Sequence, residues 1–294
     1  MKCLAAPSLV PRPVERSSPV VSVVLLGVDG GIYAVITWKV DAPTFAMPLV
    51  ETEAIVLRTY RLGEADKIAS LLTRQMGRIR AVASGAQRSR SRYGGTLEPL
   101  SYVRTWVFER ENRDLGRLNS AELMESFFDM QKDYAAQVAA QYLAEVCERL
   151  LPEREANDRV FRLVVAVLRG LKGGAGIDAP LTYFDYWFLR VGGFLPDFER
   201  CSACGRRLDD AYYGTGLEGL VCGDCRGPLT SRRVEREALA LTDALRGSTP
   251  ETWWGRKDPI AWARQLRRFL EALIEFHAER KLVTLEILEQ GVES

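Results

Sequence analysis

The chain has 294 residues, of which 47% are hydrophobic, and its formal net charge is +1. The length predicts two domains with cores of their own, and the near-zero charge excludes a protein that is basic throughout, so any nucleic-acid surface must be a local patch. Six cysteines, four of which form two close pairs, are typical of a protein from a reducing cytoplasm.

Residues 1–46 differ in character from the rest of the chain. Four early prolines, from Pro7 to Pro19, interrupt any helix or signal peptide, and Asp29 lies at the centre of the apolar run 20–38. A carboxylate there opposes membrane insertion by roughly 2.5–3.5 kcal/mol. We therefore expect residues 1–46 to be a disordered extension or a misassigned start, with translation beginning at Met47, rather than a membrane span.

Residues 47–125 predict a small β-barrel. Short runs of β-branched, apolar or alternating residues, separated by turn residues, indicate strands at 54–60, 68–73, 78–83, 101–108 and 115–119. Five strands in so short a stretch fit the OB-fold, which is common among nucleic-acid binders.

Positive charge is concentrated in the same segment. Residues 58–92 contain nine Lys or Arg and two acids, a local net charge of +7. The tightest run, 84–95, has the composition of a mobile loop, and its arginines and serines can hydrogen-bond phosphate, although such a loop can also be merely solvated. The candidate DNA-binding residues are Arg58, Arg78, Arg80, Arg88, Arg90, Arg92 and Arg104.

Aromatic rings alternate with arginine on the predicted strand 101–108. Tyr102, Arg104, Trp106 and Phe108 share one face because side chains alternate along a strand. This face fits either the barrel core or a platform on which the bases of a single strand stack.

Two CxxC pairs predict a structural zinc site. Cys201, Cys204, Cys222 and Cys225 can present four thiolates to one tetrahedral Zn²⁺, which leaves no open position for a catalytic water. The alternatives are two disulfides, which nothing in the sequence favours because nothing marks the chain as secreted, or free thiols packed as small hydrophobic groups. We expect one Zn²⁺ per chain.

Helical periodicity dominates residues 126–294. It predicts a long helix over 121–151, further helices after the capping residues Asn157 and Asp178, and two more after the knuckle at 201–225. The dense aromatic run 183–188 indicates core packing, with a partner groove as the alternative. The predicted fold class is α+β, with an N-terminal OB-fold followed by a helical domain that contains an inserted four-cysteine zinc knuckle.

The sequence offers little support for catalysis. His277 is the only histidine, and there is no Ser/His/Asp set, no HExxH and no Walker-type lysine loop. We therefore predict a nonenzymatic protein. Two other classes stay open: a zinc-ribbon transcription or translation accessory factor, and a nuclease or other DNA-modifying enzyme.

Several motifs of the barrel segment carry a family resemblance. They are ETEAIVLRTY (51–60), EAD (64–66), LTR (72–74), AVASGA (81–86), SRYG (91–94) and LEP (97–99). Together they resemble the start of the RecO recombination mediators of bacteria, and the likeness runs from Met47 to near the C-terminus. Many members of that family carry a four-cysteine knuckle at the same place. The chain departs from the family at Ser84, where many members have lysine, and in residues 1–46, which have no counterpart.

The resemblance implies a DNA repair and recombination mediator of the RecF pathway, located in the cytoplasm with the nucleoid. It implies that the barrel binds single- and double-stranded DNA, and that the helical half binds RecR and the acidic, hydrophobic-ended tail of single-strand DNA-binding protein. Strand annealing and RecA loading would follow. Arg264, Arg267 and Arg268 could form the basic rim of a pocket for that tail.

Overall fold

The computed structural model describes residues 20–28, 31–39, 48–108, 115–209, 211–214, 219–228, 232–256 and 260–292. The chain divides into two units, residues 1–47 and 48–294, and each is described by itself. In the first unit, β1 (Val20–Val28) and β2 (Gly31–Lys39) pair as an antiparallel ribbon. These two strands are the described part of residues 1–46, and the other residues of that segment lie outside the described residues. The interpretation of residues 1–46 as an extension or a misassigned start stays a prediction.

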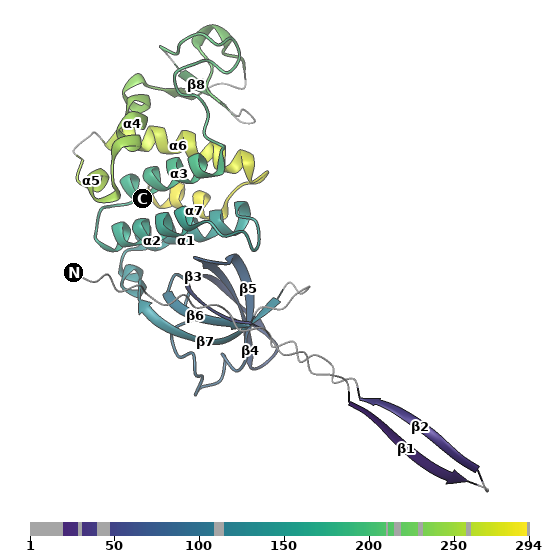
Figure 1. The fold of residues 1–294 in the computed structure, drawn as a ribbon. Helices are drawn as coiled ribbons and strands as arrows, with labels where there is room; N and C mark the ends of the chain where they lie inside the picture. Colours follow the sequence, from purple (N-terminus) through teal and green to yellow (C-terminus); the bar gives the residue numbers. More distant parts are fainter. Residues whose placement is uncertain are drawn as a thin grey trace, which may run out of the picture. The chain divides into compact units, whose positions relative to one another are not determined.

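The second unit begins with a closed five-stranded barrel (Figure 1). Its strands are β3 (Leu49–Leu62), β4 (Asp66–Thr73), β5 (Gly77–Ala83), β6 (Tyr102–Phe108) and β7 (Leu115–Glu125). The long β3 pairs with both β4 and β6, and a short parallel pairing of β5 with β7 closes the ring in the order β3-β4-β5-β7-β6. This is the predicted OB-fold.

Strand β3 is buried on both faces, which explains its uninterrupted apolar run. Ala54 and Val56 belong to the cluster inside the barrel, whereas Ile55 and Leu57 belong to the core of the helical half. A strand covered on both sides needs apolar residues at consecutive positions rather than alternate ones. The barrel therefore has one outer face covered by helices.

The loop between β5 and β6 is a series of turns that plugs the barrel. Tyr93 and Leu97 are 1% and 2% exposed, and the Tyr93 hydroxyl donates a hydrogen bond of 2.8 Å to the carbonyl oxygen of Leu118. The arginines of the run 84–95 are thus attached to a fixed segment.

Helices dominate the described residues after the barrel. They are the short η1 (Phe128–Lys132) and the α-helices α1 (Tyr134–Leu150), α2 (Asp158–Lys172), α3 (Asp178–Gly192), α4 (Arg236–Gly247), α5 (Pro250–Trp254), α6 (Ile260–His277) and α7 (Val283–Val292). Asn157 caps α2 as predicted, because its side-chain oxygen accepts from the backbone N–H of Val160. The predicted cap at Asp178 was wrong, since Ile177 holds the cap position of α3 and Asp178 is the first residue of the helix. The prediction that a helix begins at residue 121 was wrong, since residues up to Glu125 pair with β6 instead.

The aromatic run on α3 forms core, as predicted. Phe184 and Tyr186 are fully buried, and Tyr183 and Phe188 are nearly so.

The segment inserted between α3 and α4 contains the two-stranded sheet of β8 (Ala211–Tyr213) and β9 (Arg232–Val234) and the short η2 (Gly223–Cys225). No helix in the described part of the chain combines the length and the apolar character needed to cross a membrane. The predicted domain boundary at residue 125 stays a prediction.

Candidate nucleic-acid interface and metal centre

Three of the seven predicted DNA-binding arginines face the helical half. Arg58 Nε lies 3.1 Å from a carboxylate oxygen of Glu148, at the end of α1. Arg78 and Arg80, on one face of β5 as predicted, each lie 3.2 Å from the carboxylate of Glu153, in the loop between α1 and α2. These three arginines therefore share two carboxylates of the helical half, and Arg58 and Arg80 stay 41% and 42% exposed.

Backbone contacts fix the same junction. Arg78 Nε donates to the carbonyl oxygen of Leu151 at 3.0 Å, and the N–H of Arg154 donates to the carbonyl oxygen of Arg78 at 2.9 Å. Gly77 has φ +68, and a side chain there would collide with the backbone of Glu155. Only 16% of the Arg78 side chain is exposed. These contacts favour a structural role for Arg78.

The three loop arginines, Arg88, Arg90 and Arg92, are exposed. Arg92 donates to the Tyr93 hydroxyl at 3.0 Å and places its guanidinium 5.0 Å from the centre of that ring. Within the described residues, none of the three forms an ion pair. Their positive charge remains available to a polyanion.

The loop is attached to the turn between β3 and β4. The N–H of Gly85 donates to Asp66 Oδ1 at 2.7 Å, and the N–H of Gln87 donates to the carbonyl oxygen of Ala65 at 2.9 Å. The loop arginines and the β3–β4 hairpin therefore form one continuous surface.

Arg104 and its aromatic neighbours lie on the outside of β6. Arg104 is 3.6 Å from the Glu51 carboxylate, and the Trp106 indole N–H donates to the same group at 3.2 Å. Tyr102 packs against Phe161 of α2, with ring centres 6.0 Å apart. The aromatic face is thus neither barrel interior nor a fully open platform, because one of its ends is covered by the helical half.

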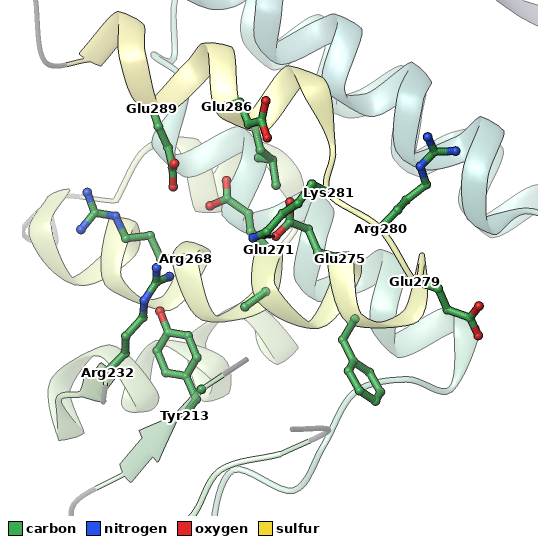
Figure 2. Close-up of a pocket in the computed structure, with 14 residues that line it drawn as sticks. Tyr213, Arg232, Arg268, Glu271, Glu275, Glu279, Arg280, Lys281, Glu286 and Glu289 are labelled. Carbon is green, nitrogen blue, oxygen red and sulfur yellow. Dashed lines mark hydrogen bonds and ion pairs between the residues drawn. The ribbon is translucent and has the colours of Figure 1, made fainter. Parts of the chain in front are cut away.

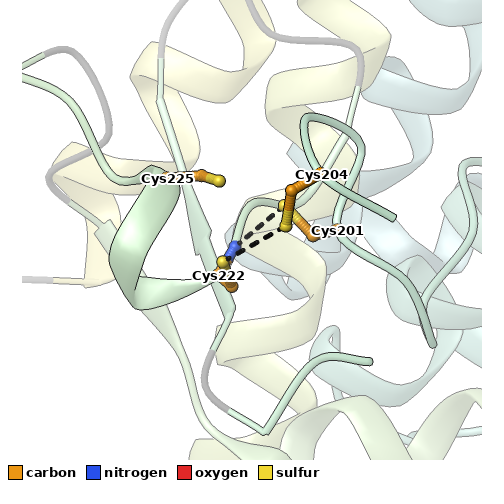
Figure 3. Close-up of side chains that lie close together, drawn as sticks. All are labelled: Cys201, Cys204, Cys222 and Cys225. Atoms are coloured by element: carbon orange, nitrogen blue, oxygen red, sulfur yellow. Dashed lines mark hydrogen bonds between the residues drawn. The ribbon is translucent and has the colours of Figure 1, made fainter. Parts of the chain in front are cut away.

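The four cysteines come together as their spacing predicts (Figure 3). The four sulfur atoms all lie within 4.8 Å of one another. Cys201 is buried, the N–H of Cys222 donates to its sulfur at 3.3 Å, and the Cys204 and Cys222 sulfurs are 3.8 Å apart. All four are free thiols rather than disulfides. Gly205, at φ +73, provides the left-handed turn that closes the first pair.

The chemistry of this donor set fits a metal ion. Burial raises the pKa of the Cys201 thiol, but backbone N–H groups, chiefly that of Cys222, outweigh burial and lower that pKa to about 6. Hydrogen bonds with Cys204 and Cys222 raise the pKa of Cys225 to about 12. Four thiolates at this density need a cation between them, and four sulfurs with no open position match structural Zn²⁺.

Arg264, Arg267 and Arg268 all line one cavity of about 510 Å³, which Arg232 also lines. Arg264 and Arg267 both pair with Asp178, at 3.1 and 3.0 Å, and the Arg267 side chain is 7% exposed. Of these three, only Arg268 lines the neighbouring cavity of about 500 Å³ between α6, α7 and β8 (Figure 2). Five glutamates surround the same cavity: Glu271, Glu275, Glu279, Glu286 and Glu289. Four cations, Arg232, Arg268, Arg280 and Lys281, line the same cavity, so its lining carries both signs of charge.

Two family models match the chain. Residues 47–127 match "Recombination protein O N terminal", and residues 131–286 match "Recombination protein O C terminal". The chain belongs to the RecO family. Its barrel and helical half are the two parts that these RecO models describe, and residues 1–46 precede both.

Individual relatives agree with this assignment. "DNA repair protein RecO" of Koribacter versatilis is 44% identical over 243 residues, which cover 82% of this chain and 99% of the relative. The proteins of the same name from Nocardioides sp. and Streptomyces griseus are 37% and 35% identical and are matched over their full length. The chain is thus a RecO-family DNA repair protein.

Sequence reasoning missed the acidic partners of the barrel arginines. Each of these arginines is far along the chain from its acidic partner, as the separation of 75 residues between Arg78 and Glu153 illustrates. The only signal was indirect: a local charge of +7 in a chain of net +1 requires acid elsewhere. It could not say which residues pair.

Proposed function

We propose that this chain is a nonenzymatic mediator of DNA repair and recombination. Its barrel binds single- and double-stranded DNA through the sugar–phosphate backbone, and its helical half binds RecR and single-strand DNA-binding protein. It promotes strand annealing and the loading of RecA in the RecF pathway, in the cytoplasm with the nucleoid. The observation that carries the proposal is the fixed loop that exposes Arg88, Arg90 and Arg92 without neutralising them.

Phosphate contacts give this interface its expected behaviour. Guanidinium groups donate to phosphate oxygens in any sequence, so binding is insensitive to base identity and falls as salt rises. Each phosphate neutralised on a single strand contributes about 0.7 to the slope of log affinity against log salt. Three loop arginines therefore account for a slope of about 2.

The transfer of a DNA strand from the coating protein to this chain needs no chemical step. The contacts to DNA and to the coating protein need only offset the contacts that they replace, which is a matter of differential binding. The chain would consume no nucleotide.

One Zn²⁺ held by Cys201, Cys204, Cys222 and Cys225 would stabilise the inserted segment. Cys201 belongs to the core cluster of the helical half, so the metal would tie the insertion directly to that core. Four-thiolate sites contribute about 10–16 kcal/mol to folding in isolated zinc fingers.

A cavity of about 760 Å³ has the chemistry required for the tail of single-strand DNA-binding protein. Its lining contains the aromatic rings of Tyr102, Phe161 and Trp254 and the rim arginines Arg162 and Arg169, and it also contains Arg74, Glu53 and Glu251. The aromatic rings suit the hydrophobic end of the tail, and the arginines suit its carboxylates.

The rim arginines remain available to such a peptide. Arg162 is 64% exposed and pairs with Asp158, and Arg169 is 57% exposed and pairs with Glu125, each at 2.9 Å. Exposed ion pairs of this kind contribute only about 0–1 kcal/mol, so a carboxylate-bearing ligand can compete for them.

Strand annealing tests the proposed function. We expect the purified full chain to anneal complementary strands without ATP, both bare and coated with single-strand DNA-binding protein, and to leave a labelled strand intact in the presence of Mg²⁺. Metal-dependent cleavage, or a lack of annealing, would contradict the proposal.

Fluorescence anisotropy with a labelled tail peptide tests the pocket. Replacing Arg162 and Arg169 with Gln should weaken peptide binding while DNA binding is retained. Unchanged peptide affinity would place the tail elsewhere.

A further inference from the structure

The cations of the barrel fall into two classes. Those on the outer face towards the helical half, Arg58, Arg78 and Arg80, pair with carboxylates of that half, and Arg74 lies 2.7 Å from Asp158. Arg61 and Lys67, near the end of the β3–β4 hairpin, form no side-chain ion pair or hydrogen bond with the residues that the structure describes. The hairpin also contains Glu64 and Asp66, but neither forms an ion pair with Arg61 or Lys67 among the residues that the structure describes, and Asp66 instead accepts from the N–H of Gly85.

Arg61 and Lys67 are direct cross-strand neighbours. The register of β3 and β4 places Arg61 opposite Lys67, one step from the pair Leu62 and Asp66. Residues directly opposite in an antiparallel pair point to the same face, and two like charges there repel each other and destabilise the pairing. No ion pair joins either cation to the acids of the hairpin, so a polyanion lying between the two groups would reduce the repulsion.

The two cations lie on the face of the β3–β4 hairpin that continues into the barrel interior, near the hairpin turn. Side chains alternate along β4, so Lys67 shares its face with Ala69 and Leu71, which belong to the interior cluster. Tyr60, 46% exposed, is on the opposite face together with Arg58. The cationic face is therefore distinct from the face that docks on the helices.

The same end of the hairpin holds the arginine loop. Asp66 accepts from the N–H of Gly85 with its side chain, at 2.7 Å, and from the Gln87 side-chain amide with its carbonyl oxygen, at 2.6 Å. Because Asp66 adjoins Lys67, the loop arginines and the hairpin cations are joined by a rigid connection. One strand of nucleic acid can follow both.

We propose that Arg61 and Lys67 bind phosphates of single-stranded DNA, and extend the path of the loop arginines along the β3–β4 hairpin. This proposal rests on the proposed function and deepens it. The path leaves the junction with the helical half untouched, so that DNA and a protein partner bind at the same time.

Salt-dependent binding of a fluorescein-labelled oligothymidylate to the full chain tests the site. In the double variant Arg61→Gln/Lys67→Gln, two phosphate contacts are lost, so the slope of log affinity against log salt should fall in magnitude by about 1.4. The thermal midpoint of the same variant should be unchanged or higher, because the like-charge repulsion is gone. If these residues had a purely structural role, the variant would keep its salt slope and its thermal midpoint would fall.

Arg149→Gln/Arg159→Gln is the matched control. It removes the same charge from exposed positions of α1 and α2 and should leave the slope as it is. If the original chain binds DNA and the hairpin variant keeps its full slope, the inference is overturned while the proposed function stands. If the original chain does not bind DNA at all, the proposed function fails and the site fails with it.

Discussion

Glu145 on α1 caps the first turn of α7 through Thr284. One oxygen of its carboxylate accepts from the backbone N–H of Thr284 at 3.0 Å and from the Thr284 hydroxyl at 2.7 Å. Glu145 is 3% exposed, and Glu148, one turn further along the same helix, pairs with Arg58 of the barrel. Helix α1 thus connects the C-terminal helix to the barrel.

Glu145→Gln should destabilise the protein by about 1–3 kcal/mol, because the charged acceptor at the start of α7 is lost in a buried setting. Glu145→Ala should cost more, since the Thr284 N–H is left without a partner. Urea unfolding measures both. Glu286→Gln, at an exposed position of α7, is the control, and equal stability of the Glu286 and Glu145 variants would contradict the capping role.

Acid should weaken the same contact. Burial raises the pKa of Glu145, but hydrogen bonds from Thr284 and Val283 outweigh burial and lower that pKa below its ordinary value of 4.5. A carboxyl whose pKa is depressed on folding contributes stability that is present above its unfolded value and is lost as pH falls through the folded value. The stability difference between the original chain and Glu145→Gln should therefore shrink below about pH 4.5. A difference that grows in acid would contradict this.

Arg78→Gln should lower stability and leave the salt dependence of DNA binding unchanged. The Leu151 carbonyl and the Glu153 carboxylate both lose a donor, at a cost of about 1–3 kcal/mol. Thermal unfolding and anisotropy titrations of the same sample give the two readouts. A reduced salt slope with unchanged stability would instead make Arg78 a DNA contact.

Metal analysis should find about one zinc per chain in protein never exposed to chelator. Cys204→Ser should abolish zinc retention and lower the thermal midpoint, because the remaining thiols cannot close a tetrahedral site. Cys147→Ala removes a buried thiol of α1 that lies outside the cluster, and should retain the metal. Protein that contains no zinc would remove the metal site from the account.

The sequence could predict the features that depend on residues close together in the chain. The CxxC spacing brings each pair of sulfurs together within a few residues, the side chain of Asn157 caps the helix that follows it, and the alternation of Arg78 and Arg80 is a property of one strand. Each of these depends on neighbours in the chain, so the residues alone carry the information.

Long-range pairing was beyond the same reasoning. The positions of Leu123, Phe127 and Met130 suit a helix as well as a strand end, and pairing with β6 decides in favour of the strand up to Glu125. The role of Arg78 depends on Leu151, 73 residues away. Composition revealed an excess of positive charge in the barrel, but only the tertiary contacts separate the arginines that pair with carboxylates of the helical half from those that do not.

Affinity for single-stranded DNA as a function of salt, with Arg88, Arg90 and Arg92 all changed to Gln in the full chain, tests the central claim most directly. The three side chains are exposed and the loop is held by Tyr93, so the variant should remain folded. We predict tight binding by the original chain at low salt, and a slope that falls in magnitude by about 2 in the variant. An original chain that ignores oligonucleotides in dilute buffer, or a variant whose slope is unchanged, would contradict the account.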